Sequence, residues 1–203
     1  MSSFQQIFSS WEGDDPEPEI EERPQWSAPP DWELGVAVPL SLVVGRSEKA
    51  AVGLRSATAF TTGAILDFFA VVRGVSPREM PMLFHHQHVA NPEMETPDAF
   101  LRLGIENADG ARVSNLGNPR RHLWSPGAAP EGPIFVPQGG SSGGSGPGRA
   151  TLNEAYWLWP LPPPGPLHVF TEWPAFDVAL SRVELDVDVL LEAARRSPRL
   201  WDD

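Results

Sequence analysis

The sequence predicts a mainly β protein, an antiparallel β-sandwich that is Ig-like in the loose sense, with one short C-terminal helix. Three observations lead to this fold class. Apolar residues recur at every second position in several short segments, which is the period of a strand with one buried face. Turn residues separate these segments at short intervals. In the body of the chain, helical periodicity is confined to a stretch near the C-terminus, so we expect layered sheets.

The first predicted strand starts at Leu34. Apolar residues occupy every even position from Leu34 to Val44. The positions between them include Gly35, Ala37, Pro39 and Ser41. Pro39 has no backbone N–H to donate, so we expect this strand to lie at a sheet edge or to bulge. Two more strands are expected over residues 50–60 and 64–73, on either side of a Thr-Thr-Gly turn. These segments supply the first three strands of the sandwich, and Leu66, Phe68, Ala70 and Val72 are expected to face inward from the third.

A hairpin is predicted in the middle of the chain. A strand over about residues 100–105 runs into Asn-Ala-Asp-Gly, and Asp-Gly is a strong turn signal, so a return strand is expected over about residues 111–116. Further strands are expected over residues 153–160, 167–173 and 178–185. A helix over residues 187–196 follows, with Asp186 as its cap and arginines in its last turn.

Composition divides the chain into an arm and a domain. Residues 1–33 hold nine acidic residues, one Arg and frequent Pro, and such a segment buries too little apolar surface to offset its chain entropy. We therefore predict an acidic flexible arm over residues 1–31 and a β-sandwich domain over residues 32–203. Within the domain, residues 117–152 are rich in Gly, Ser and Pro and are expected to form a long flexible loop.

The overall composition excludes several classes of function. The chain has 203 residues, a net charge of −12 and no Cys, so disulfides, thiolate metal sites and a Cys nucleophile are excluded. The negative charge argues against nucleic-acid partners and against binding to an anionic membrane surface. No apolar run approaches the length of a membrane span. We expect a soluble cytoplasmic protein without a cofactor, and the use of Arg in place of Lys indicates a GC-rich bacterial genome.

The C-terminal third carries a distinctive motif. Residues 156–167 read Tyr-Trp-Leu-Trp-Pro-Leu-Pro-Pro-Pro-Gly-Pro-Leu, a Glu-Trp-Pro follows at residues 172–174, and a Gly-rich stretch lies upstream. In these features the chain resembles a family of uncharacterised actinobacterial β-sandwich proteins, over about residues 34–202. The resemblance implies one sandwich domain and a bacterial origin. Because that family has no assigned activity, it implies no functional residue here.

The N-terminal arm is the leading functional candidate. Phe4, Ile7, Phe8 and Trp11 have the i, i+3, i+4, i+7 spacing of one helical face. An amphipathic helix on a flexible acidic tether is a common way to engage a groove on a protein partner. Alternatively, the same face packs on the protein's own sandwich. We therefore predict a non-catalytic protein-interaction domain with a docking arm and a protein partner.

Tryptophans suggest an alternative function. Trp157 and Trp159 alternate to one face of a predicted strand, and Trp173 lies on the next strand. If this face is exposed, the rings form a platform for a glycan or another small ligand that contains a ring. If it is buried, the rings belong to the core, and both interpretations stay open at this point.

A histidine cluster suggests a second alternative. On a strand, His86 and His88 would share a face, and with Glu93 or Glu95 they would supply ligands for Zn²⁺ in a metal-dependent enzyme. Several prolines in the same stretch favour an exposed loop instead. No Gly-x-Ser-x-Gly nucleophile motif is present. We therefore assign no catalytic residue and expect binding rather than catalysis.

Overall fold

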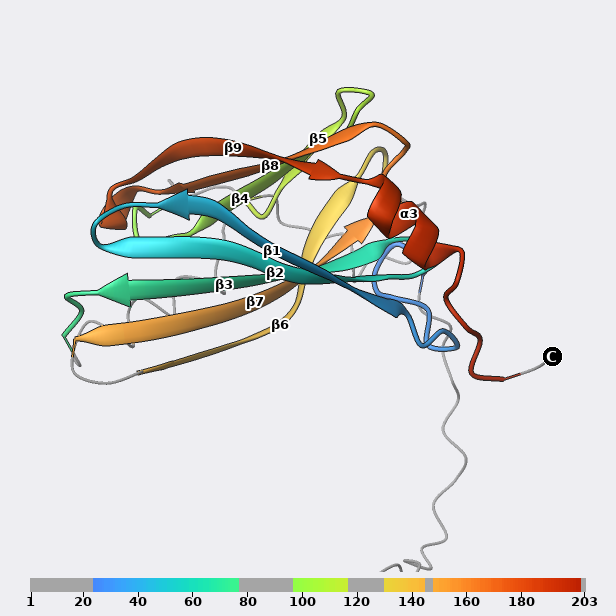
Figure 1. Cartoon of the computed structure of the whole chain (residues 1–203), viewed down its shortest axis with the longest axis horizontal. Coiled ribbons are helices and arrows are strands. Elements are labelled where there is room, and N and C mark those ends of the chain that lie inside the picture. Colours follow the sequence, from blue (N-terminus) through green and yellow to red (C-terminus); the bar gives the residue numbers. More distant parts are fainter. Residues whose placement is uncertain (1–23, 77–96, 117–129, 145–147, 202–203) are drawn as a thin grey trace, which may run out of the picture.

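A computed structural model describes residues 24–76, 97–116, 130–144 and 148–201. In this part of the chain two antiparallel sheets lie face to face, with one short α-helix at one end (Figure 1). The elements are β1 (Val36–Arg46), β2 (Ala50–Ala59), β3 (Ala64–Arg73), β4 (Arg102–Glu106), β5 (Arg112–Ser114), β6 (Ile134–Gly144), β7 (Arg149–Trp159), β8 (Pro166–Trp173), the 3₁₀ turn η1 (Pro174–Phe176), β9 (Val178–Asp186) and α3 (Asp188–Ala194). The predicted antiparallel β-sandwich with a short C-terminal helix is confirmed.

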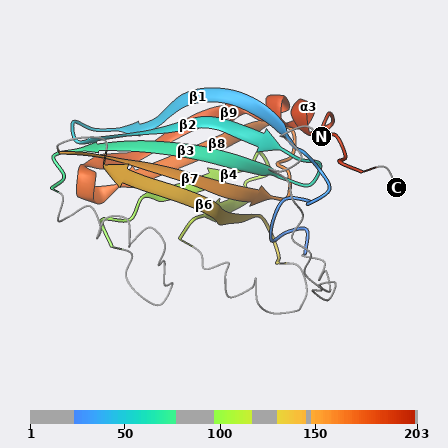
Figure 2. The ribbon, with the colours of Figure 1, turned by 90° about the horizontal axis from the view of Figure 1, so that it is seen from below.

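The two sheets differ in size. The first has five strands in the order β1-β2-β3-β7-β6, and the second has four in the order β5-β4-β8-β9. At one edge of the sandwich β1 contacts β9, and at the other β5 contacts β6. Helix α3 packs on β1 and β2 at one end of the sandwich (Figure 2). Among the described residues no helix has the length and apolar content needed to cross a membrane.

Alternate residues of the strands form the core between the sheets. Phe68 of β3 makes edge-to-face ring contacts with Phe135 of β6 and Tyr156 of β7. Each large apolar side chain buried in this way contributes about 1.5–3 kcal/mol relative to an exposed one. The inward residues predicted for the third strand are all buried, namely Leu66, Phe68, Ala70 and Val72.

The expected irregularity of the first strand is present. β1 is an edge strand, and its register to β2 shifts between Pro39 and Leu42. Ser41, inside this bulge, has a φ of 55°. Because Pro39 cannot donate to a ladder, the edge position and the bulge both accommodate it.

The long flexible loop predicted over residues 117–152 is wrong for its second half. β6 occupies residues 134–144 and pairs with β7 along its length, and β7 starts at Arg149. Residues 139–144 of the Gly/Ser run thus belong to an edge strand. One glycine has a positional role, because a Cβ on Gly140 would lie 2.8 Å from the Asn153 backbone oxygen and 2.9 Å from both carboxyl oxygens of Glu154.

A second apolar cluster covers the outer face of the five-stranded sheet. Trp157 lies at its centre and is fully buried, with an edge-to-face contact to Phe60. Trp26 covers this cluster and is itself only 5% exposed. The predicted arm of residues 1–31 therefore extends too far, because Trp26 belongs to the folded domain. The sequence alone gave no sign that a Pro-rich acidic segment contributes this ring.

Glu33 joins both ends of the described chain to the sandwich. Its carboxylate is 8% exposed and accepts hydrogen bonds from the Thr61 backbone N–H at 2.9 Å, the Thr61 hydroxyl and the Ser197 hydroxyl at 3.0 Å. The backbone of Glu33 also forms an isolated antiparallel β-bridge with that of Arg199. This carboxylate therefore links the segment before β1, the β2–β3 turn and the segment after α3.

Replacing Glu33 by Ala is expected to lower the free energy of unfolding by about 2 kcal/mol, because a charged acceptor is removed and the Thr61 N–H loses its partner. The measurement is urea unfolding of the full chain. Glu48→Ala, which removes an exposed carboxylate, is the control and should change stability by under about 0.5 kcal/mol. Equal effects of the two substitutions would contradict the linking role of Glu33.

Candidate functional site

Two of the predicted sites lie outside the described residues. These are the docking face of Phe4, Ile7, Phe8 and Trp11, and the metal site of His86 and His88. Both stay predictions. Within the described ranges no group of three or more His, Cys, Asp or Glu side chains is placed to hold a metal ion.

The predicted tryptophan platform does not form from all three rings. Trp157 is buried in the outer cluster, whereas Trp173 is buried between the sheets. The Trp173 Nε1–H donates to the Ala99 carbonyl at 2.8 Å, and its ring packs against Phe176. The predicted platform is therefore wrong for these two residues, because Trp157 lies on the outer face of the five-stranded sheet and Trp173 lies between the two sheets. The third ring, Trp159, is half-buried and lines a surface pocket.

This pocket, called here the Trp159 pocket, has a volume of about 430 Å³. It lies where three connections meet: the β4–β5 turn, the segment that leads into β6, and the proline-rich corner between β7 and β8. Trp159, Pro160 and Pro163 form an apolar wall, and Asn107 and Asp109 supply polar groups. Its size falls within the range of small-molecule sites.

Local sequence explains how the pocket walls are held. Asn107 and Ala111 close the β4–β5 turn through the Asn107 N–H, which donates to the Ala111 carbonyl at 2.9 Å. The Leu161 N–H donates to the Thr62 carbonyl at 2.8 Å and so fixes the proline-rich corner to the β2–β3 turn. At Gly165, with a φ of 121°, a Cβ would lie 2.7 Å from the Ala108 Cβ. A glycine there lets the corner and the turn approach closely.

The polar side chains of the Trp159 pocket are those of Asn107 and Asp109. Asn107 is 6% exposed, and its Oδ1 has no hydrogen-bond partner. The Asp109 carboxylate accepts a hydrogen bond from the Ala111 N–H at 2.9 Å. No Lys, Arg or His is present among the described residues that line the pocket. The described lining therefore offers an apolar ring and a carboxylate acceptor, without the cations that an anionic ligand would need.

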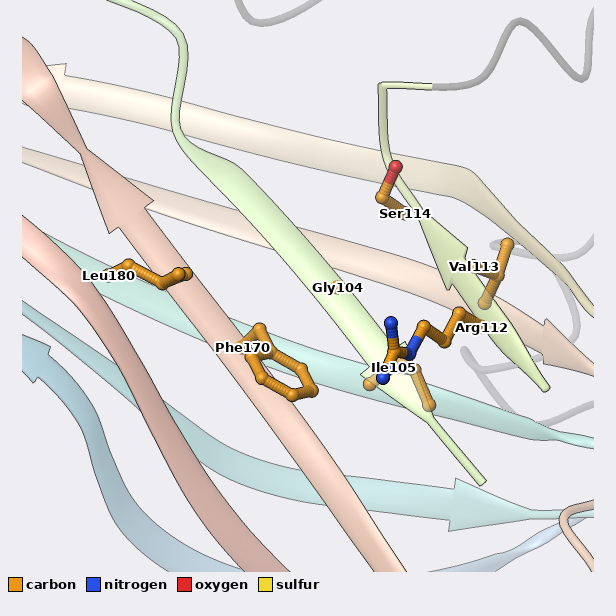
Figure 3. A pocket seen from close by; sticks show the side chains of 7 residues that line it. All are labelled: Gly104, Ile105, Arg112, Val113, Ser114, Phe170 and Leu180. Carbon is orange, nitrogen blue, oxygen red and sulfur yellow. The ribbon is translucent and has the colours of Figure 1, made fainter. Parts of the chain in front are cut away.

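A second, apolar depression lies on the outer face of the four-stranded sheet (Figure 3). Gly104 of β4 has no side chain, so a gap of about 480 Å³ opens between Phe170 of β8 and Ser114 of β5. Leu180 of β9 stands beside it and is 67% exposed. Arg112 and Ser114 are the polar side chains among the described residues of its lining.

Ion pairs surround this depression. Arg102 pairs with Glu172 at 2.6 Å, Arg112 pairs with Glu106, and Arg182 lies 3.8 Å from Glu106. The opposite charges of neighbouring strands thus neutralise each other on this face. Such exposed or half-exposed pairs contribute about 0–1 kcal/mol each.

Glu154 is the unusual titratable group of the sandwich. It points inward from β7, is 4% exposed, and its Oε1 has no hydrogen-bond partner. Burial raises the pKa of its carboxyl from 4.5 to about 7. Burial and then the charge of Glu154 also raise the pKa of Tyr156, which accepts a hydrogen bond from Asn115. Glu154 lines neither of the two pockets described above. We therefore expect its raised pKa to affect the stability of the fold.

Sequence reasoning missed both the Trp159 pocket and Glu154. Asn107 and Asp109 were predicted only as turn residues, because their approach to the proline-rich corner depends on the packing of three distant connections. Glu154 did leave a signal in the sequence. It is the one charged residue in the alternating inward series of β7, which also contains Ala150, Leu152, Tyr156 and Leu158.

No protein-family model, curated protein sequence or solved structure matches the chain. The resemblance to actinobacterial proteins therefore stays a prediction, and the functional argument depends on the geometry of the described residues.

Proposed function

We propose that the protein is a non-catalytic binding protein whose Trp159 pocket holds a small neutral ligand with a ring, and that a sugar residue of a glycan is this ligand. The observation that carries the proposal is the presence, in one pocket, of a half-buried indole and the exposed Asp109 carboxylate. Of the predicted platform residues Trp157, Trp159 and Trp173, this proposal keeps Trp159 as a ligand-binding residue.

A sugar ring matches both features of the pocket. Its C–H face packs on an indole, and its hydroxyl groups donate to the Asp109 carboxylate. An anionic ligand is disfavoured, because Asp109 is acidic and the described lining has no cation.

The other predicted functions stay predictions. The protein-interaction function of the N-terminal arm and the metal-dependent chemistry of the histidine cluster both depend on residues outside the described ranges. The Trp159 pocket supports binding without catalysis, because its described lining has one carboxylate and no second acid, base or nucleophile positioned against it.

Trp159→Ala is expected to weaken glycan binding at least about tenfold, which corresponds to about 1.4 kcal/mol of lost stacking and burial. The measurement is saturation-transfer NMR and calorimetry with a panel of neutral oligosaccharides of glucose, galactose, mannose and N-acetylglucosamine. Trp159→Phe should retain part of the affinity. Trp201→Ala is the matched control, because Trp201 is exposed and does not line the pocket. Absence of binding to the whole panel, or equal affinity of Trp159→Ala and the wild type, would refute the proposal.

A further inference from the structure

An exposed apolar patch lies where the two ends of the described chain meet. We call it the terminal patch. Four of the seven exposed large hydrophobic residues in the described ranges belong to it, with exposed fractions between 43% and 67%. They are Trp32, Leu34, Leu200 and Trp201. Scattered exposed apolar residues need no explanation, but a cluster that contains two Trp indicates an interaction surface.

Backbone pairing holds the terminal patch together. The Leu34 N–H donates to the Pro198 carbonyl at 3.1 Å, and the Leu200 N–H donates to the Trp32 carbonyl at 2.8 Å. These bonds flank the bridge between Glu33 and Arg199 and place Trp32 opposite Leu200. Because the Glu33 carboxylate is buried beneath this pairing, the patch rests on a fixed base. In Figure 1 the segment before β1 and the segment after α3 lie at the same end of the sandwich.

The charges beside the terminal patch are unlike those of the chain as a whole. Residues 193–201 contain three Arg, all exposed, and no acid, in a chain with a net charge of −12. Two Asp follow at the C-terminus, residues 202 and 203. The surface therefore places three exposed arginines beside large apolar side chains, with Asp31, Asp202 and Asp203 as the neighbouring acids in the sequence. It fits a partner that carries apolar side chains next to acidic ones.

The chain itself contains such a segment. Residues 4–11 carry the apolar series Phe4, Ile7, Phe8 and Trp11, and residues 12–22 carry seven acidic residues and no base. This segment lies outside the described ranges, which begin at Pro24, only eight residues before Trp32. The 12 residues between Trp11 and Pro24 span up to about 40 Å when extended. This length lets the apolar series return to the end of the sandwich from which it departs.

From this complementarity we propose that residues 4–22 dock on the terminal patch of the same chain. The apolar series covers Trp32 and Trp201, and the acidic run lies beside the arginines of residues 195–199. A tether makes the contact intramolecular, with an effective concentration in the millimolar range, so weak intrinsic affinity is enough to populate it. This inference is independent of the Trp159 pocket, and it assigns the predicted docking arm to a site on its own domain.

The test uses the full chain labelled with 5-fluorotryptophan, in which each of the eight Trp gives a ¹⁹F resonance assigned by a Trp→Phe substitution. The double substitution Ile7→Ser and Phe8→Ser is expected to shift the Trp32 and Trp201 resonances and to leave the Trp159 resonance in place. Gln5→Ser with Gln6→Ser is the matched control and should shift neither. Unchanged Trp32 and Trp201 resonances in the Ile7/Phe8 variant would overturn the proposal.

Two further readouts test the docking: the first separates docking within a chain from docking between chains, and the second tests the contact with Trp201. Docking within one chain predicts Trp32 and Trp201 shifts that do not depend on protein concentration, whereas concentration-dependent shifts would show exchange between copies and overturn the proposal. Cleavage after the glutamates of residues 12–22 by a Glu-specific protease should be faster in Trp201→Ser than in the wild type. Val43→Ser is the control for proteolysis, because Val43 is exposed elsewhere, on β1. Equal cleavage rates in Trp201→Ser and the wild type would also count against the contact.

Discussion

The free energy of unfolding is expected to fall by about 3 kcal/mol as the pH rises from 4.5 to about 7, because of Glu154. Burial raises the pKa of this carboxyl in the folded protein, so across this interval the folded state keeps a proton that the unfolded state has released. Stability then decreases with pH by about 1.4 kcal/mol per unit. Above about pH 7 both states are deprotonated and the contribution of Glu154 becomes constant.

Glu154→Gln isolates this contribution, because the amide has nearly the same shape and does not titrate. Urea unfolding is measured at about pH 5 and about pH 8, and the variant should gain about 3 kcal/mol relative to the wild type between these two values. Glu131→Gln is the matched control, since Glu131 is exposed. If Glu154→Gln and the wild type have parallel pH profiles, the Glu154 carboxyl is not desolvated in the folded protein.

The prediction of strands succeeded where side chains report burial. β3 shows this plainly, because its apolar residues alternate and every predicted inward residue is buried. The Gly/Ser part of β6 was missed, because Gly and Ser carry no alternating signal and their composition is typical of flexible linkers. What makes this run a strand is its partner, since β7 supplies the ladder and Gly140 leaves room for the Glu154 carboxyl. Such pairing between distant segments is invisible to local composition.

The candidate site was predictable only in part. The alternation of Trp157 and Trp159 correctly placed both rings on one face of β7, but which of them is covered depends on Trp26, more than a hundred residues away. A prediction from residue type treats the three tryptophans alike. The structure separates them, because Trp157 and Trp173 lie in apolar layers and Trp159 lies at the end of its strand, where β7 gives way to prolines.

Trp26→Ala is expected to lower the free energy of unfolding by about 3–4 kcal/mol, the usual cost of removing a large buried aromatic side chain. The loss has two parts. The apolar contacts of Trp26 disappear, and the outer cluster beneath it becomes accessible, including Trp157, whose Nε1–H is buried without a hydrogen-bond partner. The measurement is urea unfolding of the full-length variant, followed by far-UV circular dichroism.

Val43→Ala provides the control, because Val43 is an apolar residue that is 61% exposed and lies outside both the outer cluster and the terminal patch. It should change the free energy of unfolding by less than about 1 kcal/mol. A large difference between the two variants would place the start of the domain before Trp26 rather than at residue 32. Equal and small effects would mean that the sandwich retains its outer cluster without this ring, as expected for an arm that extends to residue 31.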